Sequence, residues 1–136
     1  MNTEPLLIQA VTRSDPRGNL SVLTGLADLP FSFVRLFWVH GVATGTTRGA
    51  HAHRLQHQAI ICMAGAIEVL VDDGKEARTI RLDRCDQVLH LPPLVWSEQT
   101  VIMDGTIYAA LASGPYEPED YLLDKTLWVQ ASQERR

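Results

Sequence analysis

Apolar side chains in the middle of the chain recur at every second position, as they do on strands with one buried face. Ile67, Val69 and Val71 show this alternation, and residues 59–63 form a short continuous apolar run that is typical of a fully buried strand. Turn residues separate such segments at short intervals. The pattern predicts an all-β protein.

Turns and apolar runs together indicate about eight to ten strands, at the spacing of a sandwich, jelly roll or small barrel. Asp73-Gly74 supplies the positive φ that a tight hairpin needs, and Asp-Pro-Arg-Gly at 15–18 is a second turn. Strands are expected at 19–23, within 31–42, around His51 and His53, and at 59–63, 67–71, 77–82, 87–91 and 106–112. Residues 117–129 are spaced too irregularly to decide for or against a helical turn. An immunoglobulin-like sandwich is the alternative, and it lacks support because no Cys-Trp-Cys core is present.

Length and composition favour a single domain over residues 1–136, with a short C-terminal tail. The chain is 46% hydrophobic and 21% charged, which is enough apolar material for one core. A net charge of -4 and a pI near 5.7 argue against nucleic acid or an anionic membrane as partner. Cys62 and Cys85 lie in apolar or strand-like runs and are expected to be buried free thiols. The sequence shows no signal-peptide pattern and no apolar run long enough to span a membrane, so we expect a cytoplasmic protein.

The stretch GTTRGAHAHRLQHQ at 45–58 holds the candidate chemistry. Side chains on a strand alternate between faces, so His51 and His53 point the same way. Such a pair holds a metal, carries protons near neutral pH, or lies on a solvated face.

The spacing of this stretch resembles the first signature of the cupin superfamily. Gly45 is followed by His51-x-His53, then by Gln58 and Gly65, and residues 91–97 occupy the place of the second signature. The resemblance implies a cupin-type jelly roll, the double-stranded β-helix, in agreement with the strand count. Gln58 and Ser97 stand where metal-dependent cupins carry a glutamate and a histidine. An amide and a hydroxyl are weak ligands for zinc or iron, so we expect no metal and no cofactor unless His57 turns inward.

A closer resemblance covers the chain from about Arg17 to about Leu127. It is carried by Arg17-Gly18-x-Leu20, Pro30-Phe31, Arg35, Arg48-Gly49-x-His51-Ala52-His53, Gln58, Cys62, Gly65, Asp72-Asp73-Gly74, Leu82-Asp83, Pro92-Pro93-Leu94-Val95-Trp96, Leu111-Ala112-Ser113 and Asp120-Tyr121. These residues resemble the dTDP-sugar 3,4-ketoisomerases, the WxcM-like sugar ketoisomerases of deoxyaminosugar biosynthesis. The resemblance implies isomerisation of dTDP-4-keto-6-deoxyglucose to its 3-keto isomer through an enediolate.

The resemblance also assigns roles. It makes His51 the base at C3 and His53 a partner in proton delivery or enediolate stabilisation, although the two roles are interchangeable on the sequence alone. Arg48 is the candidate for the diphosphate, since a guanidinium binds phosphate oxygens in pairs. The remaining substrate-binding candidates are Arg17, Arg35, Gln58, Trp96 and Ser97, with Trp96 either stacking on the ligand or packing in the core.

Several positions depart from the family pattern. Relatives tend to carry tyrosines in the run where this chain has Phe37, Trp38 and His40, and more extended polar residues in place of Ser97 and Leu123. A catalytically degenerate sugar-nucleotide-binding cupin and a metal-dependent cupin enzyme therefore stay open as alternatives.

A homodimer that exchanges N-terminal strands is also implied by the resemblance. The apolar stretch at 6–11 needs covering, and strand addition to a neighbouring subunit is one way to cover it.

Overall fold

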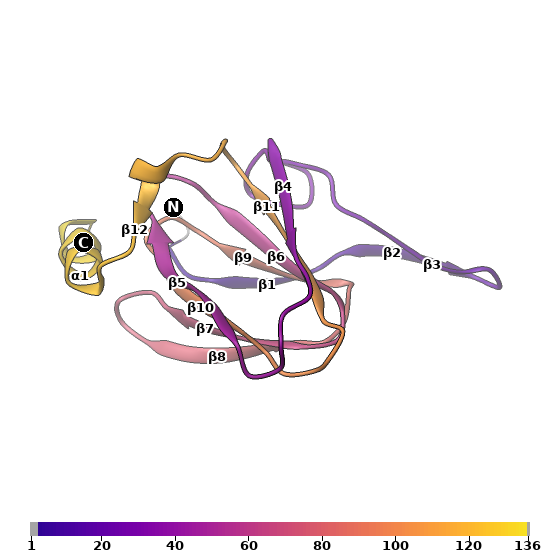
Figure 1. Ribbon diagram of the computed structural model, residues 1–136. Coiled ribbons are helices and arrows are strands. Elements are labelled where there is room, and N and C mark those ends of the chain that lie inside the picture. Colours follow the sequence, from indigo (N-terminus) through magenta and orange to yellow (C-terminus); the bar gives the residue numbers. More distant parts are fainter. Residues whose placement is uncertain (1–2, 136) are drawn as a thin grey trace.

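The computed structural model describes residues 3–135, and its strands form two antiparallel five-stranded sheets (Figure 1). The first sheet has the order β1 (Leu6–Gln9), β9 (Gln87–Leu91), β6 (Gln58–Ala64), β11 (Ile107–Ala112) and β4 (Arg35–Val39). The second has the order β12 (Tyr121–Leu122), β5 (Thr47–His53), β10 (Trp96–Val101), β7 (Ile67–Asp72) and β8 (Ala77–Leu82). The all-β, cupin-type jelly roll predicted from the sequence is confirmed.

The main core lies between the two sheets and explains the alternation seen in the sequence. Ile67, Val69 and Val71 of β7 are at most 1% exposed, and they pack with Ile60 and Leu89 of the opposite sheet. A shift of one residue in either strand would turn these side chains to the other face. The apolar pattern therefore fixes the register of both sheets, and with it the positions of the polar residues between them.

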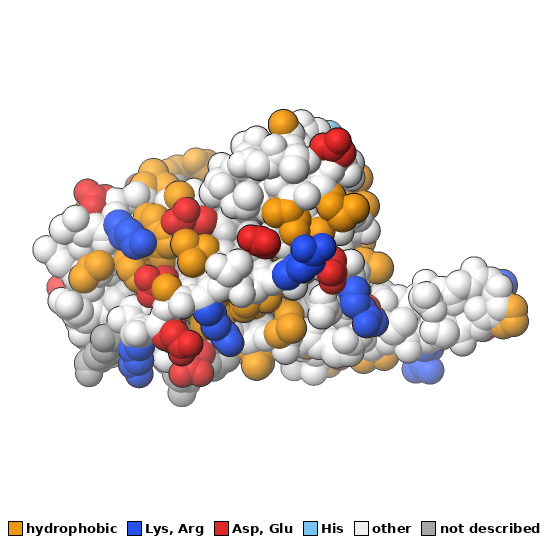
Figure 2. Space-filling model, turned by 90° about the horizontal axis from the view of Figure 1, so that it is seen from below, with side chains coloured by type: hydrophobic (Ala, Val, Ile, Leu, Met, Phe, Trp, Pro, Cys, Tyr) orange, Lys and Arg blue, Asp and Glu red, His pale blue; other side chains and the backbone are white. Residues whose placement is uncertain are grey.

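A two-stranded hairpin stands apart from both sheets. Its strands β2 (Val11–Asp15) and β3 (Gly18–Val22) pair with each other along their whole length and with no other strand in the described chain. All ten of their residues are exposed. Figures 1 and 2 show the hairpin projecting clear of the body of the molecule.

The C-terminal tail ends in a helix, α1 (Lys125–Arg135), which follows a short 3-10 turn, η1 (Pro118–Asp120). Asp124 caps the helix, because its carboxylate accepts a hydrogen bond from the backbone N–H of Thr126 at 2.7 Å. Trp128 anchors it: the indole packs on Trp96 and donates to the carbonyl of Leu94 at 2.8 Å. No helix among the described residues is both long and apolar enough to cross a membrane.

The strand predicted within 31–42 lies at 35–39, and Phe31 before it packs against the outer face of the first sheet. Two expectations need correction. Strand β10 has no counterpart among the predicted strands. Cys85 is exposed, in contrast to Cys62, because it lies in the turn between β8 and β9.

Two further histidines pair on the outer face of the first sheet. The rings of His57 and His90 are stacked, with Nδ1 of His57 2.9 Å from Nε2 of His90, and Phe31 stacks on both. His90 is fully buried, and its Nδ1 has no hydrogen-bond partner. Burial first, and the neighbouring His57 second, lower the pKa of His90 to about 4. His57 thus belongs to the packing of this face, and it does not line the cavity described below.

This pair predicts a loss of stability in acid. The folded pKa of His90 lies below that of an unfolded histidine, near 6.5, so protons bind the unfolded chain first as the pH falls. The free energy of unfolding is expected to decrease between about pH 6.5 and pH 4. Urea titrations at pH 7 and pH 5 measure this decrease. His90→Leu should reduce it, whereas the same change at the exposed His40 should not; equal losses in both variants would contradict the prediction.

Candidate active site

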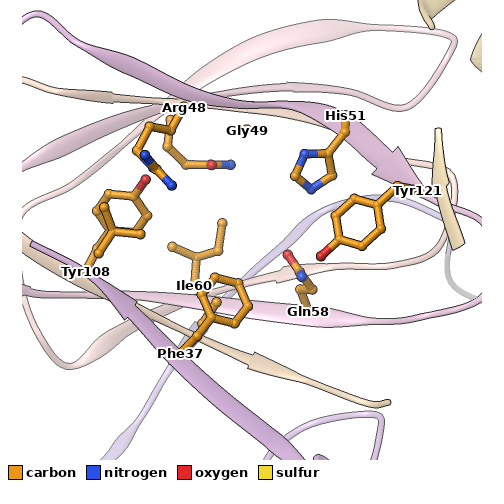
Figure 3. A pocket seen from close by; sticks show the side chains of 11 residues that line it. Phe37, Arg48, Gly49, His51, Gln58, Ile60, Tyr108 and Tyr121 are labelled. Atoms are coloured by element: carbon orange, nitrogen blue, oxygen red, sulfur yellow. The ribbon is translucent and has the colours of Figure 1, made fainter. Parts of the chain in front are cut away.

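A cavity of about 190 Å³ opens between the two sheets (Figure 3). Residues of β4, β5, β6, β10, β11 and β12 line it: Phe37, Val39, Arg48, Gly49, His51, Gln58, Ile60, Gln99, Tyr108, Ala110 and Tyr121. Polar groups from both sheets thus converge on a partly apolar hollow, which is the usual character of a small-molecule site.

The polar side chains lie at two ends of the cavity. At one end the guanidinium of Arg48 lies beside the hydroxyl of Tyr108 (Figure 3). At the other end are His51 and Tyr121, with ring centroids 4.9 Å apart and Gln58 beside them (Figure 3). The cavity therefore has one end suited to binding an anion and one end suited to transferring protons.

Backbone geometry in β5 makes room for the side chain of Gln99. Gly49 has a φ of 91°, and a Cβ there would lie 2.6 Å from Oε1 of Gln99. The pairing of β10 with β5 shifts register between Ser97 and Glu98. A glycine at 49 lets the amide of Gln99 reach the cavity wall.

His53 lies beside His51 but does not line the cavity. The two rings have centroids 5.0 Å apart, and the side chain of His53 is 8% exposed. Its Nδ1 is 2.9 Å from Oδ2 of Asp120, while its Nε2 is buried without a hydrogen-bond partner. The Asp120 carboxylate also accepts hydrogen bonds from the backbone N–H groups of Leu55 at 2.7 Å and Gln56 at 3.4 Å. Asp120 thus fixes the ring of His53 and the turn after β5 together.

Burial makes the proton-free form of both histidines favourable. It lowers the pKa of His51 below the ordinary histidine value. Burial first, and then the neighbouring His51, lower the pKa of His53 to about 4, against the opposing effect of its hydrogen bond to Asp120. His51 is thus neutral at neutral pH and competent as a base, and His53 is neutral with its Nδ1 proton directed at Asp120.

Five of the predicted site residues lie in or near the cavity. Arg48, His51 and Gln58 line the cavity. Ser97 lies next to it: it pairs with His51 across the sheet, and its hydroxyl accepts a hydrogen bond from the cavity-lining Gln99 at 2.9 Å. Arg35 lies beside the cavity-lining Phe37, with its guanidinium carbon 5.4 Å from the ring centroid, and it donates to the carbonyl of Gly114 and to the amide oxygen of Gln56.

Two predicted residues lie elsewhere in the chain. Trp96 is on the face of β10 opposite Ser97, where it packs on Trp128 of α1, so stacking on a ligand in this cavity is ruled out by its position. Arg17 lies at the tip of the β2–β3 hairpin, with a side chain 91% exposed that pairs with Asp15. Within one chain it is not part of the cavity.

Sequence analysis assigned no role to Gln99, Tyr108 or Tyr121, although all three line the cavity. A signal for the first existed: on a strand, Gln99 must share a face with Ser97. Tyr108 lies within the apolar strand β11, and no sequence pattern distinguishes it from the core residues around it. Tyr121 belongs to a two-residue strand that pairs with His53, which sequence periodicity does not reveal.

The donor set of the cavity does not fit a transition metal. Between residues 3 and 135, no three His, Cys, Asp or Glu side chains come together in a way that could hold an ion. The neighbours of His51 on the cavity wall are an amide and a phenol, which are poor ligands for zinc or iron. Independence from metal remains a prediction.

The fold and the cavity define a jelly-roll protein with an acid/base site for a small anionic ligand. Comparisons with known proteins narrow this class. The family model FdtA, described as WxcM-like, C-terminal, matches residues 2–133, so the chain belongs to this family. A curated relative, the TDP-4-oxo-6-deoxy-alpha-D-glucose-3,4-oxoisomerase of Aneurinibacillus thermoaerophilus, is 32% identical over 108 residues, covering 79% of this chain and 78% of the relative.

Solved structures agree with this assignment. The sugar 3,4-ketoisomerase QdtA from Thermoanaerobacterium thermosaccharolyticum, in complex with TDP, superimposes with a TM-score of 0.93 at 29% identity, over 99% of this chain and 98% of that one. A 3,4-ketoisomerase from Helicobacter canadensis gives a TM-score of 0.91 at 26% identity, over 97% and 99%. A histidine-to-asparagine mutant of QdtA has been solved with TDP-4-keto-6-deoxyglucose. The family resemblance seen in the sequence is confirmed.

Proposed function

We propose that this protein is a sugar-nucleotide 3,4-ketoisomerase, which converts dTDP-4-keto-6-deoxyglucose to a dTDP-3-keto-6-deoxyhexose without a metal. The observation that carries the proposal is the neutral imidazole of His51, which faces a cavity whose far end presents a guanidinium. The relatives described above are 3,4-ketoisomerases. Two of them are described with TDP or a TDP-linked sugar.

The isomerisation requires a base and a second group that can carry a proton. The C4 ketone acidifies the proton on C3, a base removes it, and the resulting enediol is protonated at C4. His51 is the base in this scheme. His53, held by Asp120, supports it from behind the cavity wall, and Gln58 lies where an amide can bond a sugar oxygen.

Isomerisation itself is tested by proton NMR of dTDP-4-keto-6-deoxyglucose incubated with protein that has been treated with a chelator and assayed for metal. We expect resonances of a 3-keto isomer. Tight TDP binding with no conversion would instead favour a degenerate binding protein, and conversion restored only by added metal would favour a metal-dependent cupin.

Arg48 binds the diphosphate in this account, because its guanidinium is the cationic group that lines the cavity. Arg48→Met is expected to weaken TDP binding by roughly 10- to 100-fold, equivalent to losing about 1.5–3 kcal/mol from a hydrogen bond to a charged group. Isothermal titration calorimetry measures this, with Arg81→Met, an exposed arginine on β8, as the control. Unchanged affinity would place the diphosphate elsewhere.

A homodimer is part of the proposal. The outer face of the first sheet exposes several large apolar side chains, among them Leu36, Trp38 and Met63. The projecting hairpin also exposes Val11, Leu20 and Val22. A second copy of the chain would cover both surfaces. Because Arg17 lies away from the cavity of its own chain, it can contribute to substrate binding only at the site of a partner.

Mixing two variants tests this arrangement. Arg17→Ala and His51→Asn are each expected to be poorly active as homodimers. When they are unfolded and refolded together, each mixed dimer contains one cavity with an intact His51 and an intact Arg17 from the other chain. About half of the dimers are mixed, so activity should return to about a quarter of that of the unsubstituted protein. If mixed dimers are shown to have formed and activity does not recover, a shared site is excluded.

We also propose that the enzyme is located in the cytoplasm, where sugar nucleotides are made and used.

A further inference from the structure

An amide lies on the cavity wall between the guanidinium of Arg48 and the imidazole of His51. Gln99 of β10 is opposite Arg48 in the register of the two strands, and Ser97 is opposite His51. Gln99 is 8% exposed and lines the cavity. Its side chain reaches Gly49, which Figure 3 shows between Arg48 and His51. The order along this wall is therefore a cation, an amide and an imidazole.

An irregularity in β5 brings the cation and the imidazole to the same wall. Arg48 and His51 are three residues apart, and on a regular strand an odd separation puts two side chains on opposite faces. The register of β5 against β10 shifts at this point and leaves Ala50 as an extra residue. Gly49 and Ala50 both have a positive φ, of 91° and 57°. A bulge of this kind redirects side chains, and here both Arg48 and His51 face the cavity.

Ser97 orients the amide of Gln99. Nε2 of Gln99 donates a hydrogen bond to the hydroxyl of Ser97 at 2.9 Å. Oε1 is directed at the backbone of Gly49, where a Cβ would lie 2.6 Å from it. The wall between Arg48 and His51 thus presents a carbonyl oxygen, which accepts hydrogen bonds and cannot donate them.

A carbonyl oxygen at this place selects one group of the substrate. Diphosphate and ketone oxygens are acceptors at neutral pH, so they do not bond to it. The hexose of dTDP-4-keto-6-deoxyglucose carries hydroxyls on C2 and C3 alone, and the hydroxyl of the deoxyribose lies beyond the diphosphate. With the diphosphate of C1 at Arg48 and C3 at His51, C2 lies between them, next to Gln99.

We propose that Gln99 is a specificity-determining residue, which accepts a hydrogen bond from the C2 hydroxyl of the hexose and so selects 2-hydroxy over 2-deoxy sugars. Because C2 is bonded to C3, the same contact holds C3 at the imidazole of His51. A 2-deoxy sugar would leave the buried amide oxygen without a donor, which disfavours its reaction. This inference rests on the proposed ketoisomerase function and adds the hydroxyl pattern of its substrate.

Two substrates and two proteins test the inference. The kcat/KM of the unsubstituted protein and of Gln99→Met is measured with dTDP-4-keto-6-deoxyglucose and with its 2-deoxy analogue. Methionine is close to glutamine in length but is only a weak acceptor. We expect the substitution to lower kcat/KM by about 5- to 20-fold for the 2-hydroxy substrate, and by no more than about twofold for the 2-deoxy analogue.

The design separates the contact from other effects. Each substrate is compared with itself on the two proteins, so the influence of the C2 hydroxyl on the acidity of the C3 proton cancels. Gln130→Met, the same change at an exposed position of α1, is the control and should alter neither value by more than about twofold.

The outcomes distinguish the two levels of the argument. Equal losses with both substrates, or no loss with either, would overturn the role of Gln99 and leave the ketoisomerase function in place. An unsubstituted protein that does not turn over the 2-hydroxy substrate would overturn the proposed function and this role with it. If Gln99→Met does not fold, Gln99→Asn keeps the amide on a side chain one methylene shorter: a loss confined to the 2-hydroxy substrate supports the role, and any other pattern overturns it.

Discussion

Replacing His51 by asparagine is expected to lower kcat by about 10³- to 10⁴-fold, while TDP affinity changes by no more than a few-fold. His51 is the neutral imidazole on the cavity wall, and asparagine is close to it in size and polarity but cannot take a proton from carbon. Because the imidazole lies at the end of the cavity opposite Arg48, the nucleotide should bind almost unchanged.

Steady-state kinetics, together with calorimetric titration of TDP, measure both effects. His40→Asn is the matched control, since this exposed histidine is outside the cavity lining. A variant with His51→Asn that turned over at more than a tenth of the original rate would remove His51 from the role of base. Loss of TDP binding would instead mean that His51 holds the ligand.

Asp120→Asn should damage both stability and catalysis. The buried carboxylate accepts hydrogen bonds from His53 and from the backbone N–H groups of Leu55 and Gln56. An amide offers one accepting oxygen in place of two and carries no charge. We expect the free energy of unfolding to fall by about 1–3 kcal/mol, since at least one buried donor loses its partner.

The catalytic effect of Asp120→Asn follows from the same contacts. His53 would lose the acceptor that fixes its tautomer, and the strand that carries Tyr121 would lose its anchor. We expect kcat to fall by roughly 10- to 100-fold, which is the effect of raising the activation free energy by the full value of one charge-assisted hydrogen bond. Glu119→Gln, at the exposed neighbouring position, is the control. A variant that unfolds earlier yet keeps full kcat at low temperature would make Asp120 purely structural.

The fold was predictable where one face of a strand is apolar. Strand β7 could be read from Ile67, Val69 and Val71 because all three face the core. Strand β10 could not, since Ser97 and Gln99 turn toward the cavity and Trp96 turns outward under α1. The polar residues of the site interrupt the apolar pattern, so prediction failed at the strand that carries part of the function.

The part of the site that lies on a single strand was predictable. The shared face of His51 and His53 follows from alternation, and the structure brings their rings to 5.0 Å. Their different depths could not be predicted, because the burial of His53 depends on Asp120, 67 residues further along the chain.

Two placements could have been foreseen from local rules. Trp96 and Ser97 are adjacent on one strand, so they cannot both face the cavity. Arg17 follows Asp15-Pro16 in a tight turn, a position that exposes its side chain at the end of a hairpin. Trp96 and Arg17 were selected because of the resemblance to the ketoisomerases, and a resemblance in sequence does not show where a side chain lies.

Incubation of dTDP-4-keto-6-deoxyglucose with the protein in deuterated water, followed by proton NMR, tests the central claim most directly. The account predicts a 3-keto isomer that carries deuterium at C4 in at least part of the product, because the imidazolium of His51 exchanges with solvent, and that retains its proton at C5. Deuterium at C5, or exchange at C3 without any 3-keto product, would contradict the account and indicate an epimerase.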